Sequence, residues 1–123
     1  NRETKSIGAE DTFPYDLTEV NEMNAELDKL SQTVANRVQG YQLKGRTITL
    51  KIKYSDFRQI TRNYSVTEPV NDFITISEAT KKLLLATEPE DKRIRLLGVT
   101  LSNFGEAVSK HKSPDNPEQL ELF

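Results

Sequence analysis

Apolar residues return every three or four positions between Leu17 and Tyr41, the longest such pattern in the chain. This is the spacing of one face of an α-helix, and it predicts a long amphipathic helix of about seven turns. Asp16 or Thr18 can cap its start, and Gly40 lies near its end. The residues of the apolar face are Leu17, Val20, Met23, Leu27, Leu30, Val34, Val38 and Tyr41.

A second, shorter helix is predicted after the loop around Pro69. Thr75 and Glu78 have the spacing of a capping box at its start, and the polar residues from Thr87 to Lys92 end it. Its apolar face consists of Ile76, Ala79, Leu83 and Leu84.

Strict alternation replaces helical spacing from Arg46 to Tyr54, which predicts a half-buried strand. Ser55-Asp56 is a turn signal, and residues 58–66 are rich enough in β-branched and aromatic side chains to form the hairpin partner. Residues 94–104 are predicted as the strongest remaining strand, and Lys5 to Phe13 as a weaker strand candidate that leads into the long helix. The alternating faces are Ile48, Leu50, Ile52 and Tyr54 against Thr47, Thr49, Lys51 and Lys53, and Leu97, Val99 and Leu101 against Gly98, Thr100 and Ser102.

The predicted order is therefore β-α-β-β-α-β. With right-handed crossovers, this order gives an α+β fold, a four-stranded antiparallel sheet with two helices on one face. A chain of 123 residues has room for one such domain with one core.

Neither predicted helix covers the other face of the predicted sheet. Its side chains supply ammonium and hydroxyl donors for phosphate oxygens, but it lacks the aromatic residues on which single-stranded bases stack. We expect this face to hold the backbone of double-stranded nucleic acid. The donors are Thr47, Thr49, Lys51, Lys53, Thr100 and Ser102.

Charge is unevenly distributed although the net charge is only -2. Residues 10–28 contain seven acidic side chains and no basic one, whereas residues 44–62 contain six basic side chains and one acidic one. We expect one surface to repel phosphate and another to attract it. Glu19, Glu22 and Glu26 fall on the solvated face of the long helix, where they do not converge as catalytic carboxylates.

Composition excludes several classes of protein. No apolar run approaches the roughly 20 residues of a membrane helix, and the absence of cysteine removes disulfides and thiolate metal sites. We expect a cytoplasmic protein without membrane partners. The chain starts at Asn1 without an initiator Met, which is compatible with a fragment of a longer protein.

The last five residues, Gln119-Leu120-Glu121-Leu122-Phe123, place three apolar side chains at the end of a polar tail rich in proline. Such a tail predicts a flexible segment over residues 106–118 that presents a short peptide to a pocket on another protein. Gln119, Leu120, Leu122 and Phe123 resemble the motif by which bacterial replication and repair proteins bind the sliding clamp. The alternative is that Phe123 folds back onto its own domain.

The ordered part of the chain resembles the C-terminal little finger domain of the Y-family translesion DNA polymerases, in particular the bacterial DNA polymerase IV group. The resemblance covers about residues 2 to 104. The matching segments are Lys5-Ser6-Ile7-Gly8, Gly45 to Tyr54, Ser55 to Arg62 and Ile94 to Phe104.

The resemblance implies that residues 5–105 lie in the major groove of the template-primer duplex and grip both backbones, while residues 1–4 link them to a thumb domain. Relatives with a more basic last strand have charged side chains where this chain has Leu96 and Thr100, which suggests a weaker grip here. The resemblance also implies that the metal-binding carboxylates and their magnesium belong to a palm domain outside this chain, so we expect no catalytic residue, metal site or cofactor here. The positions implied to contact DNA are Lys5, Ser6, Gln59, Thr61, Arg62, Thr100 and Ser102, in addition to Lys51 and Lys53 from the open sheet face.

Sequence reasoning thus favours an accessory domain of an error-prone polymerase, with template-primer DNA, the sliding clamp (β subunit) and the other polymerase domains as partners. A stand-alone adaptor that binds the clamp without touching DNA is the main alternative. A small enzyme of similar fold lacks a nucleophile-base pair, because His111 is the single histidine and lies in the tail.

Overall fold

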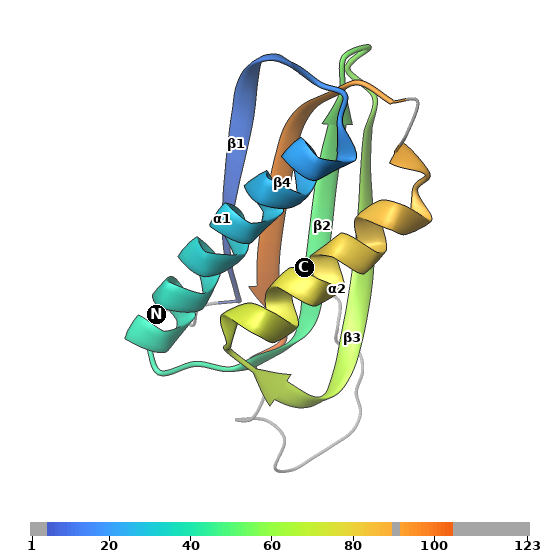
Figure 1. Ribbon diagram of the computed structural model, residues 1–123. Helices are drawn as coiled ribbons and strands as arrows, with labels where there is room; N and C mark the ends of the chain where they lie inside the picture. The colour runs from blue at the N-terminus through green and yellow to red at the C-terminus, as the bar shows by residue number, and fades with distance from the viewer. Residues whose placement is uncertain (1–4, 90–91, 105–123) are drawn as a thin grey trace.

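The structure is a computed structural model that describes residues 5–89 and 92–104. Four antiparallel strands form one sheet in the order β1-β4-β2-β3, and both helices pack on the same face of it (Figure 1). The predicted α+β fold and its β-α-β-β-α-β order are confirmed. The elements are β1 (Ser6–Leu17), α1 (Val20–Gly40), β2 (Gly45–Tyr54), β3 (Gln59–Val70), α2 (Phe73–Ala86) and β4 (Ile94–Ser102).

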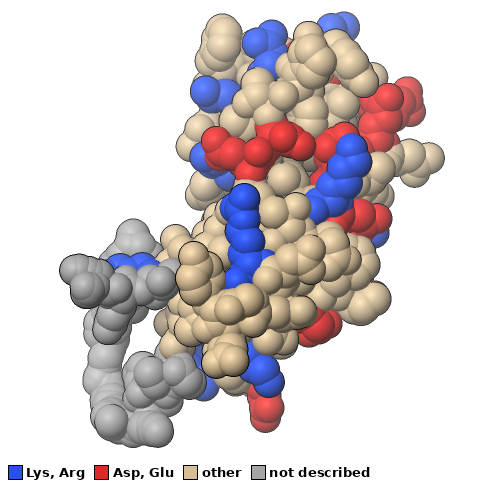
Figure 2. Space-filling model, turned by 90° about the vertical axis from the view of Figure 1, so that its left-hand side faces the viewer, with Lys and Arg blue, Asp and Glu red and all other residues tan. Residues whose placement is uncertain are grey.

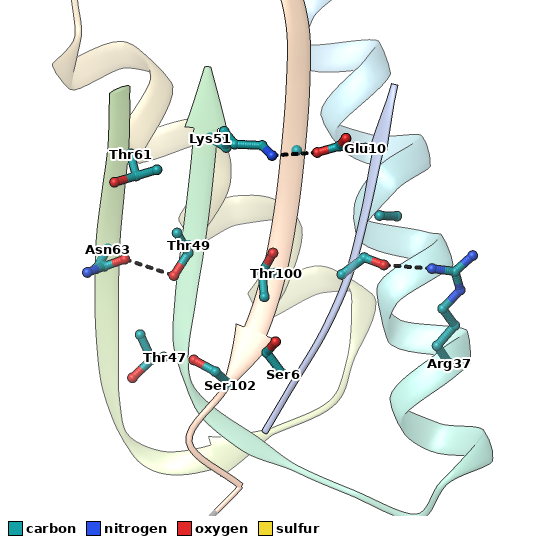
Figure 3. Close-up of a pocket in the computed structure, with 13 residues that line it drawn as sticks. Ser6, Glu10, Arg37, Thr47, Thr49, Lys51, Thr61, Asn63, Thr100 and Ser102 are labelled. Carbon is teal, nitrogen blue, oxygen red and sulfur yellow. Dashed lines mark hydrogen bonds and ion pairs between the residues drawn. The ribbon is translucent and has the colours of Figure 1, made fainter. Parts of the chain in front are cut away.

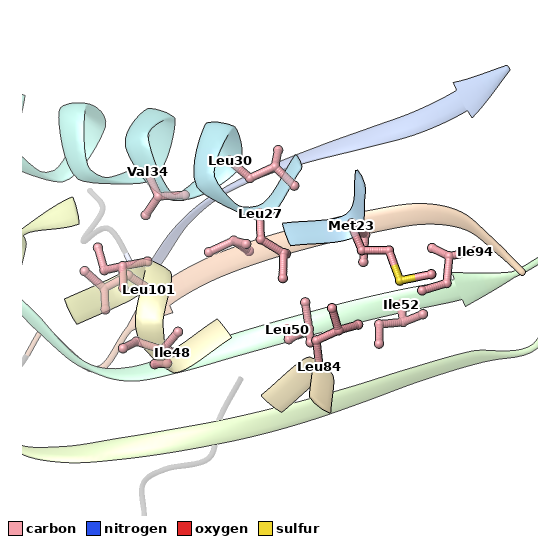
Figure 4. Close-up of a cluster of buried hydrophobic side chains, with 14 of the residues drawn as sticks. Met23, Leu27, Leu30, Val34, Ile48, Leu50, Ile52, Leu84, Ile94 and Leu101 are labelled. Atoms are coloured by element: carbon pink, nitrogen blue, oxygen red, sulfur yellow. The ribbon is translucent and has the colours of Figure 1, made fainter. Parts of the chain in front are cut away.

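The hydrophobic core lies between the helices and the sheet (Figure 4). Met23, Leu27 and Val34 from α1 are fully buried in this core, where α1 packs mainly over β1 and β4. Each fully buried side chain of this size stabilises the fold by about 1.5 to 3 kcal/mol relative to an exposed one. The strand residues that alternate into the core are Ile48, Leu50, Ile52 and Tyr54 from β2 and Leu97, Val99 and Leu101 from β4, as the sequence predicts.

The predicted start of the long helix is wrong by three residues. Leu17 pairs with Ile94 at the end of β1, and α1 begins at Val20 after Glu19, whose side chain makes no capping hydrogen bond. Asp16 does not cap the helix, because its carboxylate accepts a hydrogen bond from Nε of Arg95 at 3.3 Å. An apolar residue at position 17 fits the helical spacing and the strand end equally well, so spacing alone misplaced the boundary.

The second helix is capped by Asp72, not by the predicted box of Thr75 and Glu78. The Asp72 carboxylate accepts a hydrogen bond from the backbone N–H of Thr75 at 2.9 Å. Partial burial raises the pKa of Asp72, but the hydrogen bonds from Thr75 outweigh this effect and leave the pKa below its ordinary value. β3 also continues to Val70, past the predicted end at residue 66, because Pro69 is tolerated in an edge strand.

A polar contact joins the two helices above the core. Asp28 on α1 lies 2.7 Å from Nζ of Lys81 on α2 and accepts a hydrogen bond from the Ser77 hydroxyl at 2.9 Å. The hydrogen bond from Lys81 lowers the pKa of Asp28 against the opposing effect of partial burial, and Ser77 adds to the lowering. Neither of the two described helices is long and apolar enough to cross a membrane.

Candidate nucleic-acid interface

Strand register places mainly polar residues in four rows across the face of the sheet that the helices leave uncovered. We call this surface the open face. Successive residues of a strand alternate between the two faces, so the register alone fixes which residues share it. From β1 to β4, β2 and β3 the rows are Ser6, Ser102, Thr47 and Ser65; Gly8, Thr100, Thr49 and Asn63; Glu10, Gly98, Lys51 and Thr61; and Thr12, Leu96, Lys53 and Gln59. Figure 3 shows residues from the rows that contain Ser6, Thr100 and Lys51.

The middle of the open face is a shallow hollow of about 770 Å³. Thr49 donates a hydrogen bond to Oδ1 of Asn63 at 2.8 Å, which orients both side chains on neighbouring strands. Gly8 leaves room for Thr100, because a Cβ atom at position 8 would lie 2.6 Å from the Thr100 hydroxyl oxygen. Small side chains therefore give a flat, polar floor that a sugar-phosphate backbone can approach closely.

Arg37 closes one side of this hollow. It comes from the last turn of α1, and its Nη1 donates a hydrogen bond to the backbone oxygen of Gly8 at 2.6 Å. The contact satisfies a carbonyl on the edge strand β1 and brings a guanidinium to the rim of the open face. Sequence reasoning missed Arg37, because a helical residue 29 positions from Gly8 carries no signal of this contact.

Lys51, predicted to attract phosphate, forms an ion pair. Its Nζ atom lies 2.7 Å from Oε1 of Glu10, and the pair crosses β4 above Gly98 (Figure 3). The expectation of separate acidic and basic surfaces is therefore wrong at this point, since an acidic residue of β1 lies beside a basic residue of β2. Figure 2 likewise shows acidic and basic side chains next to one another on the side of the molecule where β1 and α1 lie.

The hairpin turn between β2 and β3 also contains an ion pair, formed by Asp56 and Arg58. Asp56 accepts hydrogen bonds from the backbone N–H of Arg58 at 3.0 Å and from its Nε at 3.2 Å. The backbone hydrogen bond is the main cause of a lowered pKa for Asp56, with the guanidinium contributing. Two of the cations that sequence reasoning assigned to a basic hairpin, Lys51 and Arg58, thus have carboxylate partners.

The structure brings most of the predicted contact residues together, but not Arg62. In the register, Arg62 pairs with the buried Leu50, so its side chain leaves β3 on the helix side of the sheet. Its Nη1 donates to the backbone oxygen of Thr61 at 2.9 Å. Ser102 is on the open face but is only 7% exposed, which leaves little of its hydroxyl accessible. The predicted residues that share the open face are Ser6, Lys51, Lys53, Gln59, Thr61, Thr100 and Ser102. Lys5 is exposed directly before β1, but it is adjacent to Ser6 and belongs to none of the four rows.

The predicted clamp-binding residues Gln119, Leu120, Leu122 and Phe123 lie outside the described residues, as does His111. Within residues 5–89 and 92–104, no group of three His, Asp or Glu side chains is arranged to hold a metal ion.

Comparison with known proteins identifies the family. Residues 4–122 match the impB/mucB/samB family C-terminal domain, so the chain belongs to this family. The chain is 44% identical over 122 residues to DNA polymerase IV of Alkalilimnicola ehrlichii and 38% identical over 122 residues to DNA polymerase IV 2 of Agrobacterium fabrum. Each alignment covers 99% of this chain and 33% of the relative. The chain therefore spans about a third of the length of these relatives.

Solved structures agree with this assignment at the level of the fold. A complex of the beta-clamp processivity factor and the little finger domain of PolIV matches with a TM-score of 0.68 at 21% identity, over 95% of this chain and 97% of that one. The insertion ternary complex of Dbh DNA polymerase matches with a TM-score of 0.70 at 20% identity, over 80% of this chain and 28% of that one. The resemblance to the little finger domain of Y-family polymerases is confirmed.

Proposed function

We propose that this chain is the accessory domain of an error-prone translesion DNA polymerase and that it grips the template-primer duplex by its backbone. The open face carries this proposal, since it offers hydroxyl and ammonium donors on a flat floor that neither described helix covers. Such donors position a protein on a duplex without reading its sequence. The curated relatives are DNA polymerases IV, and a protein of the same fold is known in a ternary polymerase complex.

The chain's own residues would bind and position DNA, not perform chemistry. In this proposal residues 1–4 link the domain to a thumb, residues 5–105 form the little finger, residues 106–118 are a flexible tail and residues 119–123 bind a sliding clamp. Phosphoryl transfer would take place in a separate palm domain, where carboxylates hold magnesium ions. Gln119, Leu120, Leu122 and Phe123 would anchor the polymerase on the clamp, and a little finger domain of the same fold is known in complex with a beta-clamp.

The number of phosphates neutralised follows from the cations near the open face. Lys53 and Arg37 have no carboxylate partner among the described contacts, whereas Lys51 is paired with Glu10. Lys5, adjacent to Ser6, lies outside the four rows. With about two phosphates neutralised, log affinity should fall against log salt with a slope of about -2. The grip is therefore weak and dependent on salt.

The experiment compares Lys53→Ala with Arg62→Ala in the full chain. Both variants remove one positive charge from the hairpin, but Lys53 lies on the open face and Arg62 on the helix side. Binding of a fluorescent duplex is measured by anisotropy between about 50 and 200 mM salt. Lys53→Ala should make the slope shallower by about 1 and weaken all sequences equally, whereas Arg62→Ala should leave the slope nearly unchanged.

Equal losses in the two variants would show that DNA does not use the open face. A wild-type chain that binds a sliding clamp but no duplex, at any salt concentration in this range, would support the stand-alone adaptor instead.

A further inference from the structure

The Lys51–Glu10 ion pair lies in the middle of the surface that is proposed to hold DNA. Lys51 leaves β2 and Glu10 leaves β1, and their charged groups meet above β4, the strand between them. Gly98 on β4 makes this crossing possible, because a Cβ atom there would lie 3.2 Å from Cβ of Glu10 and 3.5 Å from Cβ and Cε of Lys51. The pair is thus held over a bare patch of backbone.

The pair is accessible to a competing anion. The side chains of Lys51 and Glu10 are 35% and 51% exposed, so water and salt screen their attraction, and a phosphate group can reach the ammonium. Asp16 and Asp56, which lie near the hairpin turn, are paired with arginines, away from Lys51. A phosphate that approaches Lys51 therefore meets one specific carboxylate, that of Glu10.

We propose that Glu10 competes with DNA phosphate for Lys51 and thereby limits the affinity of the open face; this inference rests on the duplex binding proposed above. In the free protein the carboxylate neutralises the lysine. When a phosphate displaces it, the freed carboxylate stays in the same row of the open face and repels the same DNA strand. Lys51 then contributes no net positive charge to the complex, although it lies at the centre of the surface.

The test uses Glu10→Gln, which keeps the shape of the side chain and removes its charge. Exposed ion pairs of this kind correspond to about a two- to fivefold change in an equilibrium constant, so Glu10→Gln should bind duplex DNA about two- to fivefold more tightly. Because Lys51 then neutralises one more phosphate, the salt slope should become steeper by about 1. A purely structural role for Glu10 would not steepen the slope.

Asp11→Asn is the matched control. Asp11 is the next residue of β1 and is also exposed, but it pairs with Leu97 and so faces away from the open face. Asp11→Asn changes the net charge by the same amount as Glu10→Gln. The gain in duplex affinity from Glu10→Gln must exceed the gain from Asp11→Asn. It must also disappear when Glu10→Gln and the wild-type chain are compared in the presence of Lys51→Ala.

The outcomes separate this inference from the proposed function. If the wild-type chain binds DNA and Glu10→Gln binds no more tightly than Asp11→Asn, the competition is refuted while duplex binding stands. An equal gain with and without Lys51 would also overturn it, because Glu10 would then repel DNA independently of the lysine. If neither the wild-type chain nor Glu10→Gln binds duplex DNA, both proposals fail.

Discussion

Replacing Gly8 by alanine should destabilise the domain, although alanine normally favours ordered structure. The added Cβ atom would lie 2.6 Å from Oγ1 of Thr100 and 2.9 Å from the backbone oxygen of Val99. The Thr100 hydroxyl can rotate, but the Val99 oxygen belongs to the β1–β4 ladder and can move only with the strand. Forcing a methyl group into packed structure costs about 1 to 3 kcal/mol, so Gly8→Ala should lower the free energy of unfolding by about this amount.

Gly40→Ala provides a control with the same substitution and the opposite sign. Gly40 is the last residue of α1, its φ is not positive, and nothing lies within 4 Å of an added Cβ atom. Alanine at a compatible position stabilises a protein by about 0.4 to 1 kcal/mol because it restricts the unfolded chain. Gly40 therefore ends α1, as the sequence predicts, but in a helical conformation rather than with a positive φ.

Urea denaturation of both variants measures the difference. With a slope of about 2 kcal/mol per molar urea, a loss of about 2 kcal/mol in Gly8→Ala lowers the midpoint by about 1 M. Gly40→Ala should shift the midpoint slightly upward or leave it in place. If Gly8→Ala were as stable as the wild-type chain, the close approach of β1 and β4 at Thr100 would be wrong, and with it the flat floor of the open face.

Two further predictions concern acid and the tail. The pKa values of Asp28 and Asp72 are lowered in the folded chain, so their contribution is fully present above the unfolded value of about 4 and is lost as the pH falls through the folded values below it. The urea midpoint of unfolding should therefore decrease when the pH is lowered below about 4. Combining Asp28→Asn with Asp72→Asn should make this decrease smaller, and an unchanged dependence of the midpoint on pH would contradict the two contacts. Deleting residues 119–123 should abolish clamp binding, measured by surface plasmon resonance, without lowering the unfolding temperature. A loss of more than about 1 kcal/mol would instead indicate that Phe123 packs on its own domain.

The spacing of apolar residues located the helices and strands, but not the contacts that set where the helices begin. The alternation of residues 46–54 survives folding because β2 lies at the centre of the sheet with one apolar and one polar face. The start of α1 failed because Asp16 is held by Arg95, 79 residues later in the chain, and no local pattern contains that contact. Capping by Asp72 was missed for the opposite reason, since Thr75 three residues later offered an equally good local signal.

The sequence predicted the phosphate donors of the open face, but it did not predict how the charges on that face are paired. Adjacent residues of a strand must face opposite sides, so Thr61 and Arg62 could not both lie on the open face, and alternation along residues 58–66 already contained that information. The Lys51–Glu10 pair was beyond sequence reasoning, because it depends on the register of β1 and β2 against β4. Gly98 between two charged neighbours in one row becomes meaningful only after that register is known.

These charges bear on why a clamp-binding tail would accompany this surface. With Lys51 paired and Arg62 on the helix side, the proposed grip should resemble non-specific binding, with a dissociation constant of about 10 to 100 μM or weaker. A short flexible tether on a DNA-loaded clamp raises the local concentration of the duplex to about 1 mM, at which such a surface is mostly bound. Without the clamp the same surface would release DNA readily. A weak open face and an apolar C-terminal peptide would therefore be complementary, since the proposed clamp contact would confine binding to DNA that already carries a clamp.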